Sequence, residues 1–200
     1  MAYNFFAAIS RMKYIGRWAL MRNSREETLS EHSLEVAMIA HALCIIGNVR
    51  YGHKMNAEKA ALIGIYHDAS EIITGDMPTP VKYYNSNIRS AYKDVEQIAD
   101  EKLLSKLPDD LKDEFDSIFK GDEDDPEDTY MRRLVKAADK LSALIKCMEE
   151  RQSGNSEFRT AENSIRKKVD GMSRDLPEVR DFMDEFLPAY GKTLDELNNN

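Results

Sequence analysis

The stretch at residues 62–73, LIGIYHDASEII, decides the fold prediction because it places His67 and Asp68 side by side within an apolar run. Burying such a pair is costly unless hydrogen bonds or an opposite charge compensate it. A divalent cation compensates well, because it favours the ionised carboxylate and the neutral imidazole. Adjacent side chains on a helix diverge by about 100°, so both can reach an ion that lies between them. The stretch therefore predicts a core-facing helix that carries metal ligands.

Two other apolar stretches each carry one polar residue in the same unusual way. His32 begins the apolar run 34–43, and Asp139 lies within LVKAADKLSAL, residues 134–144. Three helices that each bring a polar side chain to a core-facing position build metal sites in helical folds. Two imidazoles and two carboxylates suit Mn²⁺, Co²⁺ or Fe²⁺, with positions left for water. We therefore expect one divalent cation, with His32, His67, Asp68 and Asp139 as its ligands.

Each of these residues has a simpler explanation when it is taken alone. A His-Asp dipeptide is common at protein surfaces, and Asp139 can pair with Lys136 or Lys140 on a solvated helix face. The order H…HD…D in an apolar helical context favours the metal site over three separate coincidences. The other two histidines, His41 and His53, have no partner pattern, and no role is assigned to them.

The rest of the chain is typical of helices joined by short turns, with no convincing alternation of a β-strand. Thr28 and Glu31 predict a capping box, and Asn56 can cap a helix over residues 57–74 that closes at Gly75. A helix is expected over residues 5–15. A second helix carries the apolar run 34–43 and is ended by Gly47 and the polar stretch at residues 51–53. Further helices are expected over residues 88–107, 110–119, 127–151, 157–169 and 177–187. The fold class is all-α, as a single domain of residues 1–200 whose last few residues form a frayed tail.

Composition excludes several classes of function. The 200-residue chain has a formal net charge of −8, which argues against bulk binding to nucleic acid or to an anionic membrane. Cys44 and Cys147 lie in apolar helical runs and form no disulfide framework, which is typical of a reducing compartment. Basic residues interrupt the N-terminal segment, so no apolar stretch there approaches the roughly 20 residues that span a bilayer. We expect a cytoplasmic protein.

The motifs resemble a known family. Residues 31–34, EHSL, residues 67–71, HDASE, and Asp139 give the metal-ligand order of the HD superfamily. The resemblance is closer to the bacterial HD-domain 5′-deoxynucleotidases, because it includes Arg17-Trp18, the loop GDMPTPVK at residues 75–82 and KCMEE at residues 146–150. It runs from Phe5 to about Leu194.

The resemblance implies a single-domain HD-domain helical bundle that acts as a homodimer. Its implied activity is metal-dependent removal of phosphate from 2′-deoxyribonucleoside 5′-monophosphates. By position, His32, His67, Asp68 and Asp139 are the metal ligands, and Arg17 and Trp18 hold and orient the phosphate. Glu71 assists proton transfer as a catalytic residue, together with Trp18 and Asp68, and the sugar site is lined by Asp76, Met77, Pro78 and Thr79. The substrate side of the site also includes His32, Asp68 and Asp139.

The chemistry of these residue types agrees with the implied roles but leaves alternatives open. Glu71 follows His67 by four residues, so both project from one face of a continuous helix, although Glu71 is equally a plain surface acid. Arg17 can bind phosphate bidentately or lie at the surface. Trp18 can shield the phosphate or pack in the core. Asp76 can accept a hydrogen bond from a sugar hydroxyl or cap the turn before the next proline.

Three other functions compete with this prediction. The first is an HD phosphohydrolase of nucleoside triphosphates or of cyclic or alarmone nucleotides, which needs extra basic residues. The conspicuous ones near the motifs are only Arg17, Arg22 and Lys82, which suits a monophosphate better. The second is a metal-stabilised binding module without catalysis, with a coordination sphere closed by protein ligands. The third, a metal oxygenase, needs additional histidines for a second iron.

Overall fold

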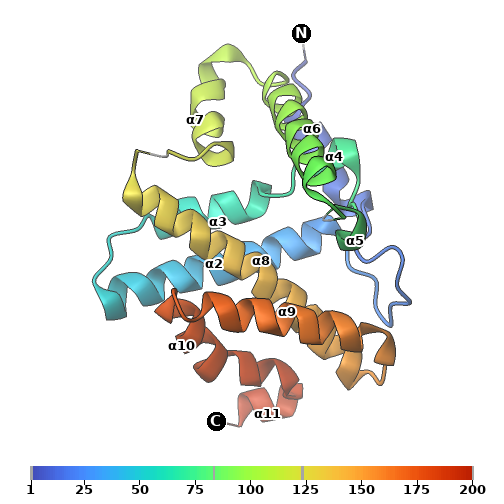
Figure 1. The fold of residues 1–200 in the computed structure, drawn as a ribbon. Coiled ribbons are helices and arrows are strands. Elements are labelled where there is room, and N and C mark those ends of the chain that lie inside the picture. The colour runs from blue at the N-terminus through green and yellow to red at the C-terminus, as the bar shows by residue number, and fades with distance from the viewer. Residues whose placement is uncertain (1, 83, 123, 200) are drawn as a thin grey trace.

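The computed structural model describes residues 2–82, 84–122 and 124–199 (Figure 1). Every secondary-structure element named in that part of the chain is a helix. The elements are, in order, α1 (Phe5–Ile9), η1 (Ser10–Tyr14), α2 (Leu29–Tyr51), α3 (Ala57–Tyr66), α4 (Glu71–Thr74), α5 (Thr79–Lys82), α6 (Ser86–Leu104), α7 (Asp109–Phe119), α8 (Pro126–Gln152), η2 (Ser156–Phe158), α9 (Arg159–Met172), α10 (Pro177–Glu185), η3 (Leu187–Gly191) and α11 (Leu194–Asn198). The all-α prediction is confirmed.

Helices α2, α3 and α8 form the centre of the molecule; α2 and α8 carry two of the polar motifs, and the third follows the end of α3. They cross the middle of Figure 1, with α9 to α11 on one side and α4, α6 and α7 on the other. The main core unites Val36, Leu43, Leu134 and Leu141, among others, from these helices. A second, smaller core around Phe5 supports α6 and the turn after α3. The turn with the His67-Asp68 motif therefore contacts the second core, while His32 and Asp139 lie on helices of the main core.

Helix α2 begins and ends as its sequence predicts, with one correction. The Thr28 side chain accepts a hydrogen bond from the Glu31 backbone N–H, and the Glu31 side chain accepts one from the Thr28 backbone N–H. Gly52 ends the helix with a left-handed φ of 75°. The prediction that Gly47 helps to end the helix is wrong. Gly47 lies inside α2, where neighbouring side chains pack closely against it: a Cβ at Gly47 would lie 2.6 Å from Met55 Cε and 2.9 Å from Glu178 Oε1.

Helix α2 is long and apolar enough to cross a membrane by length and composition, with a hydropathy of 1.4 over its apolar window. However, 56% of that window is buried inside the fold. Its apolar character is therefore accounted for in large part by its position at the centre of the protein.

The predicted helix over residues 57–74 is interrupted. It ends at Tyr66, and a turn from His67 to Ser70 leads into the short helix α4. Within this turn the bonds span three residues, from the Ala69 N–H to the Tyr66 carbonyl and from the Glu71 N–H to the Asp68 carbonyl. These i→i−3 bonds wind the backbone more tightly than an α-helix does. The tighter turn changes the directions of successive side chains at the metal motif.

A glycine allows α3 to approach α2 closely. A Cβ added at Gly64 would lie 2.7 Å from the Ala37 Cα, a contact with backbone that no side-chain movement relieves. The carbonyl oxygen of Gly64 also accepts a hydrogen bond from Nδ1 of His67, at 2.8 Å. Gly64 therefore sets both the spacing of the two helices and the orientation of one ligand ring.

The close approach at Gly64 predicts that Gly64→Ala separates α3 from α2. We expect the variant to lose about 1–3 kcal/mol of unfolding free energy, because the added methyl overpacks a backbone contact. Gly171→Ala in α9 is the matched control, since its Cβ meets nothing within 4 Å. A helical alanine there should be neutral or stabilising by up to about 1 kcal/mol. Urea denaturation of both variants checks this, and equal stabilities would contradict it.

Candidate metal centre

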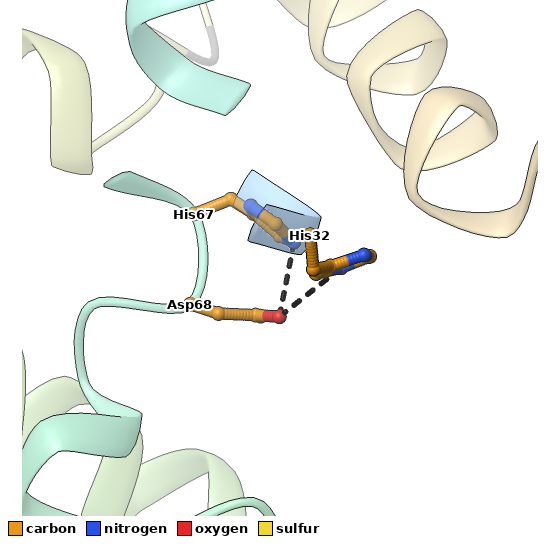
Figure 2. A group of neighbouring side chains, drawn as sticks. All are labelled: His32, His67 and Asp68. Carbon is orange, nitrogen blue, oxygen red and sulfur yellow. Dashed lines mark ion pairs between the residues drawn. The ribbon is translucent and has the colours of Figure 1, made fainter. Parts of the chain in front are cut away.

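Three side chains from α2 and the turn after α3 converge on one point, and a fourth from α8 lies beside them. His32, His67 and Asp68 each offer one ligand atom, and these atoms lie within 4.8 Å of one another (Figure 2). The Asp68 Oδ2 lies 3.0 Å from the His67 Nε2 and 3.7 Å from the His32 Nε2. Asp139 joins from α8, with its Oδ1 3.4 Å from the His32 Nε2. The structure thus brings together all four residues that the sequence predicts as ligands.

The donor set fits a divalent cation. His32 Nε2 and His67 Nε2 are both buried and have no hydrogen-bond partner among the described residues. The opposite nitrogen of each ring is held, by the Ser142 hydroxyl at 2.9 Å for His32 and by the Gly64 carbonyl for His67. A carbonyl only accepts, so His67 carries its proton on Nδ1 and directs Nε2 toward the carboxylates. Metal-binding imidazoles are held by the same arrangement.

The electrostatics of the cluster favour ionised carboxylates. Burial alone would raise the pKa of Asp68, but the neighbouring His67 lowers it to about 2. Burial acts in the same direction on Asp139, whose pKa is nevertheless held well below its usual range by His32 and Lys140. Burial lowers the pKa of His67, but Asp68 and Asp139 raise it to about 9. A cation at this point competes with that proton, because a ligating imidazole is neutral.

Asp139 also forms the ion pair with Lys140 that was the simpler explanation of this residue. The Lys140 Nζ lies 2.8 Å from the Asp139 Oδ2, so the predicted pairing with a neighbouring lysine exists. The other carboxylate oxygen, Oδ1, is the one that faces His32. The ion pair and the convergence on the cluster therefore coexist, each using a different oxygen.

Two residues that the sequence analysis did not name complete the support of His32. Ser142 donates its hydroxyl proton to Glu35 Oε2 at 2.6 Å, and its Oγ lies 2.9 Å from His32 Nδ1. Because the Ser142 proton is engaged by a carboxylate, its oxygen accepts from the His32 Nδ1–H and leaves Nε2 for a ligand. Ser142 follows Asp139 by three residues and Glu35 follows His32 by three, one helical turn in each case. That spacing is the only feature of the sequence that could have pointed to Ser142 and Glu35 as supports of the ligands.

Arg17 and Trp18 lie beside the cluster in the segment before α2. The Arg17 side chain is only 12% exposed, so the alternative of a surface arginine is wrong. Burial lowers its pKa, but Glu27, Asp139, Asp68 and Asp76 outweigh this effect and raise it. Arg17 Nη1 donates to Glu27 Oε2 at 2.6 Å, and Trp18 Nε1 donates to the same oxygen at 2.9 Å. The sequence analysis did not name Glu27.

Glu71 is buried beside the cluster, at the first residue of α4. It is 6% exposed, so the alternative of a plain surface acid is wrong. Burial, Asp68 and Asp76 raise the pKa of Glu71 to about 9. Its Oε2 has no hydrogen-bond partner among the described residues. The expectation that Glu71 and His67 share one face of a continuous helix is wrong, because the turn at residues 67–70 separates them.

The four residues predicted at the sugar site lie together between α4 and α5. Asp76 is half-buried and close enough to Glu71 and Arg17 to change the pKa of both. Met77 and Pro78 are also half-buried, and Thr79 begins α5 and is exposed. The structure thus places Asp76 near Glu71 and Arg17, with the other three residues directly after it in the chain.

A cavity of about 250 Å³ adjoins the cluster. Both His67 and Asp139 line it, as do Asp100 from α6 and Lys136 from α8. Burial raises the pKa of Asp100 to about 7. The sequence analysis missed Asp100, because nothing near it in the sequence distinguishes it from the other acids of α6. The cavity gives the cluster an open side.

A family model and curated relatives of known name match nearly the whole chain. A family model described as "5′-deoxynucleotidase YfbR-like" matches residues 4–190. A curated 5′-deoxynucleotidase of Shewanella oneidensis is 48% identical over 197 residues, 98% of this chain and 97% of that protein. The 5′-deoxynucleotidase YfbR of Salmonella typhi is 48% identical over 195 residues, 98% of this chain and 96% of that protein.

Solved structures share the fold at lower identity. An HD-domain phosphohydrolase of Listeria innocua has a TM-score of 0.78 and 24% identity, and the match covers 94% of this chain and 88% of that one. The HD phosphohydrolase of cyanophage S-2L, bound to dA and one catalytic Zn²⁺ ion, has a TM-score of 0.62 and 18% identity, with coverage of 94% and 96%. These structures confirm the predicted HD-domain fold.

The contact between Ser142 and His32 predicts that Ser142→Ala weakens metal binding about 10–100-fold, since such supporting bonds orient a ligating imidazole. Ser142→Thr keeps the hydroxyl and should bind metal nearly as the unaltered protein does. Ser164→Ala, at an exposed position of α9, is the matched control. Titration with Co²⁺, followed by its visible absorption, measures the affinities. Unchanged Co²⁺ affinity in Ser142→Ala would show that the hydroxyl does not support the ligand.

Proposed function

The chain belongs to the YfbR-like 5′-deoxynucleotidase family, and from that premise we propose that it hydrolyses 2′-deoxyribonucleoside 5′-monophosphates to the deoxynucleoside and phosphate at the cluster of His32, His67, Asp68 and Asp139. The observation that carries the proposal is the pair of buried Nε2 atoms of His32 and His67, which have no hydrogen-bond partner among the described residues and face the carboxylates of Asp139 and Asp68. Such a set of nitrogen and oxygen donors, beside an open cavity, suits phosphoester hydrolysis assisted by a metal.

The cofactor that we propose is one divalent cation, Co²⁺ or Mn²⁺, held by these four side chains. Two imidazoles and two carboxylates are donors that suit both ions. When bound, the cation supplies a Lewis acid for the phosphoryl oxygens and lowers the pKa of a water molecule. Fixed ring orientations at His32 and His67 support this role, because the bonds at both Nδ1 atoms direct both Nε2 atoms toward the carboxylates.

Arg17 and Trp18 are proposed to hold and orient the phosphoryl group. Glu27 engages one edge of the Arg17 guanidinium, which leaves its remaining N–H groups for phosphoryl oxygens. The guanidinium carbon lies 5.7 Å from the centre of the Trp18 ring, within the range of a cation–π contact. The Trp18 ring can thereby keep water from the group that binds phosphate.

Glu71 and the following segment are proposed to act on the nucleoside side of the scissile bond. Burial raises the pKa of Glu71 and so favours its protonated form, which can donate a proton to the departing 5′-oxygen. The Asp76 carboxylate can accept a hydrogen bond from the sugar 3′-hydroxyl. Met77, Pro78 and Thr79 then line the sugar site.

We further propose that the protein acts as a homodimer in the cytoplasm. Helix α2 exposes an apolar stripe of Leu34, Met38, Ile45 and Val49, with exposed fractions of 58%, 58%, 42% and 78%. The positions recur at three to four residues or multiples of this spacing, so they share one helix face that a second copy of the chain can cover. Cys44 and Cys147 are buried free thiols, which suits a reducing compartment.

Metal addition and substrate choice test the reaction. Chelator-treated protein given Co²⁺ or Mn²⁺ should release phosphate from deoxyribonucleoside 5′-monophosphates and much less from the ribonucleotides. Asp68→Asn should abolish release because it removes a charged ligand, whereas Asp170→Asn, at an exposed position of α9, should not. Release of pyrophosphate from triphosphates instead would assign the chain a different phosphohydrolase activity.

The proposed proton transfer predicts that Glu71→Gln lowers kcat by about 10²–10⁴-fold, the usual contribution of a positioned acid or base. Its Co²⁺ affinity should stay within a few-fold of the unaltered protein, because Glu71 is not among the proposed ligands. Steady-state kinetics and Co²⁺ titration on one preparation measure both. Unchanged kcat would show that Glu71 does not supply the proton and that another group acts as the acid.

A further inference from the structure

The segment that carries Arg17 and Trp18 folds back on itself before α2; it is called the N-terminal arm here and comprises residues 15–28. Its two ends pair through hydrogen bonds from the Arg17 N–H to the Glu27 carbonyl, at 2.9 Å, and from the Leu29 N–H to the Ile15 carbonyl, at 2.8 Å. An isolated antiparallel bridge joins Gly16 and Thr28. The pairing places the Glu27 side chain against Arg17 and Trp18.

One carboxylate oxygen binds both of these side chains. Glu27 Oε2 accepts from Arg17 Nη1 at 2.6 Å and from Trp18 Nε1 at 2.9 Å. Arg17 and Glu27 are 12% and 11% exposed, so their ion pair is largely shielded from solvent. Charge-assisted bonds of this kind fix the plane of a guanidinium. The carboxylates of Asp68 and Asp139 act electrostatically on the same guanidinium, which shows that it lies close to the proposed metal ligands.

The backbone of Trp18 is held in a strained conformation by its surroundings. Its φ is +59°, in the left-handed region, the only such value among the non-glycine residues that the structure describes. In an extended backbone, successive side chains point to opposite faces. The turn at Trp18 instead allows two adjacent side chains to meet at one oxygen. Strain of this kind persists only where the surroundings over-determine it, and it concentrates at functional sites.

The part of the arm between its paired ends is anchored by contacts that do not involve Glu27. The Glu150 carboxylate accepts from the backbone N–H of Ser24, at 2.8 Å, and of Arg25, at 3.3 Å. Lys146 bonds to both Glu150 and the Arg25 carbonyl. These contacts attach the arm to α8, the helix that carries Asp139. Folding of the arm therefore has its own support, and the Glu27 side chain serves the Arg17–Trp18 pair.

We propose that Glu27 is a positioning residue for the phosphoryl group. It fixes the Arg17 guanidinium so that its free N–H groups face the metal ligands, and it ties that guanidinium to the Trp18 indole. Phosphate then meets donors whose orientation is already set, which reduces the ordering that binding requires. The inference rests on the proposed function, because it takes Arg17 as the residue that binds phosphate.

Glu27→Gln tests the proposal, because it keeps the size of the side chain but removes its charge. We expect the KM for a deoxyribonucleoside 5′-monophosphate and the dissociation constant of inorganic phosphate both to rise about tenfold, while kcat changes less than about threefold. Trp18 is the only tryptophan of the chain, so its fluorescence reports the contact directly. Its emission should differ between the two proteins and should respond to phosphate more weakly in the variant.

Glu26→Gln is the matched control, because Glu26 is the neighbouring acid of the arm and is exposed. It should leave KM, phosphate affinity and Trp18 emission unchanged. If Glu27→Gln does not fold, Glu27→Asp replaces it, since a shorter acid keeps the charge but cannot span both donors. Phosphate binding to the metal-loaded proteins is measured by calorimetry as well as by turnover.

The outcomes separate this inference from the proposed function. If the unaltered protein releases no phosphate, the proposed function fails, and the calorimetric comparison still tests Glu27. If the unaltered protein is active and Glu27→Gln or Glu27→Asp binds phosphate as tightly, with the same Trp18 emission, the positioning role is overturned. A fall in kcat at unchanged KM and phosphate affinity would also overturn it.

Discussion

The structure depends on the compensation of charge at one buried point. Two carboxylates stay ionised beside two buried imidazoles where α2, α8 and the turn after α3 meet. Buried charged groups are tolerated only when the groups that pair with them are held in place. Close packing at Gly64, the support of His32 by Ser142 and the enclosed Arg17 are three forms of that fixation. A cation at the centre would complete it.

One face of α8 connects these parts. Asp139, Ser142, Lys146 and Glu150 follow one another at three- and four-residue steps, so they lie on a continuous stripe. The first faces the metal ligands, the second supports His32, and the last two hold the N-terminal arm. A single rigid helix therefore sets the distance between the proposed metal and the arginine proposed to bind phosphate.

Much of this could be predicted from sequence, because the relevant signals are local. The capping box at Thr28, the presence of most of the longer helices and the four proposed ligands are marked by short patterns or by a polar residue in an apolar run. The break after Tyr66 could not be predicted, since residues 67–74 have the apolar pattern of a continuing helix. Glu27 and Ser142 were missed for a different reason. Their partners are chosen by tertiary packing, as for Ser142 and His32, 110 residues apart in the chain.

The central claim is that His32, His67, Asp68 and Asp139 hold one divalent cation. A crystal structure of the Co²⁺-loaded protein, with anomalous diffraction at the cobalt edge, tests it most directly. We expect one strong anomalous peak per chain, from an ion coordinated by Nε2 of both histidines and by an oxygen of each aspartate, at about 2.0–2.2 Å. A peak elsewhere, or a cation that leaves His32 Nε2 uncoordinated, would contradict it.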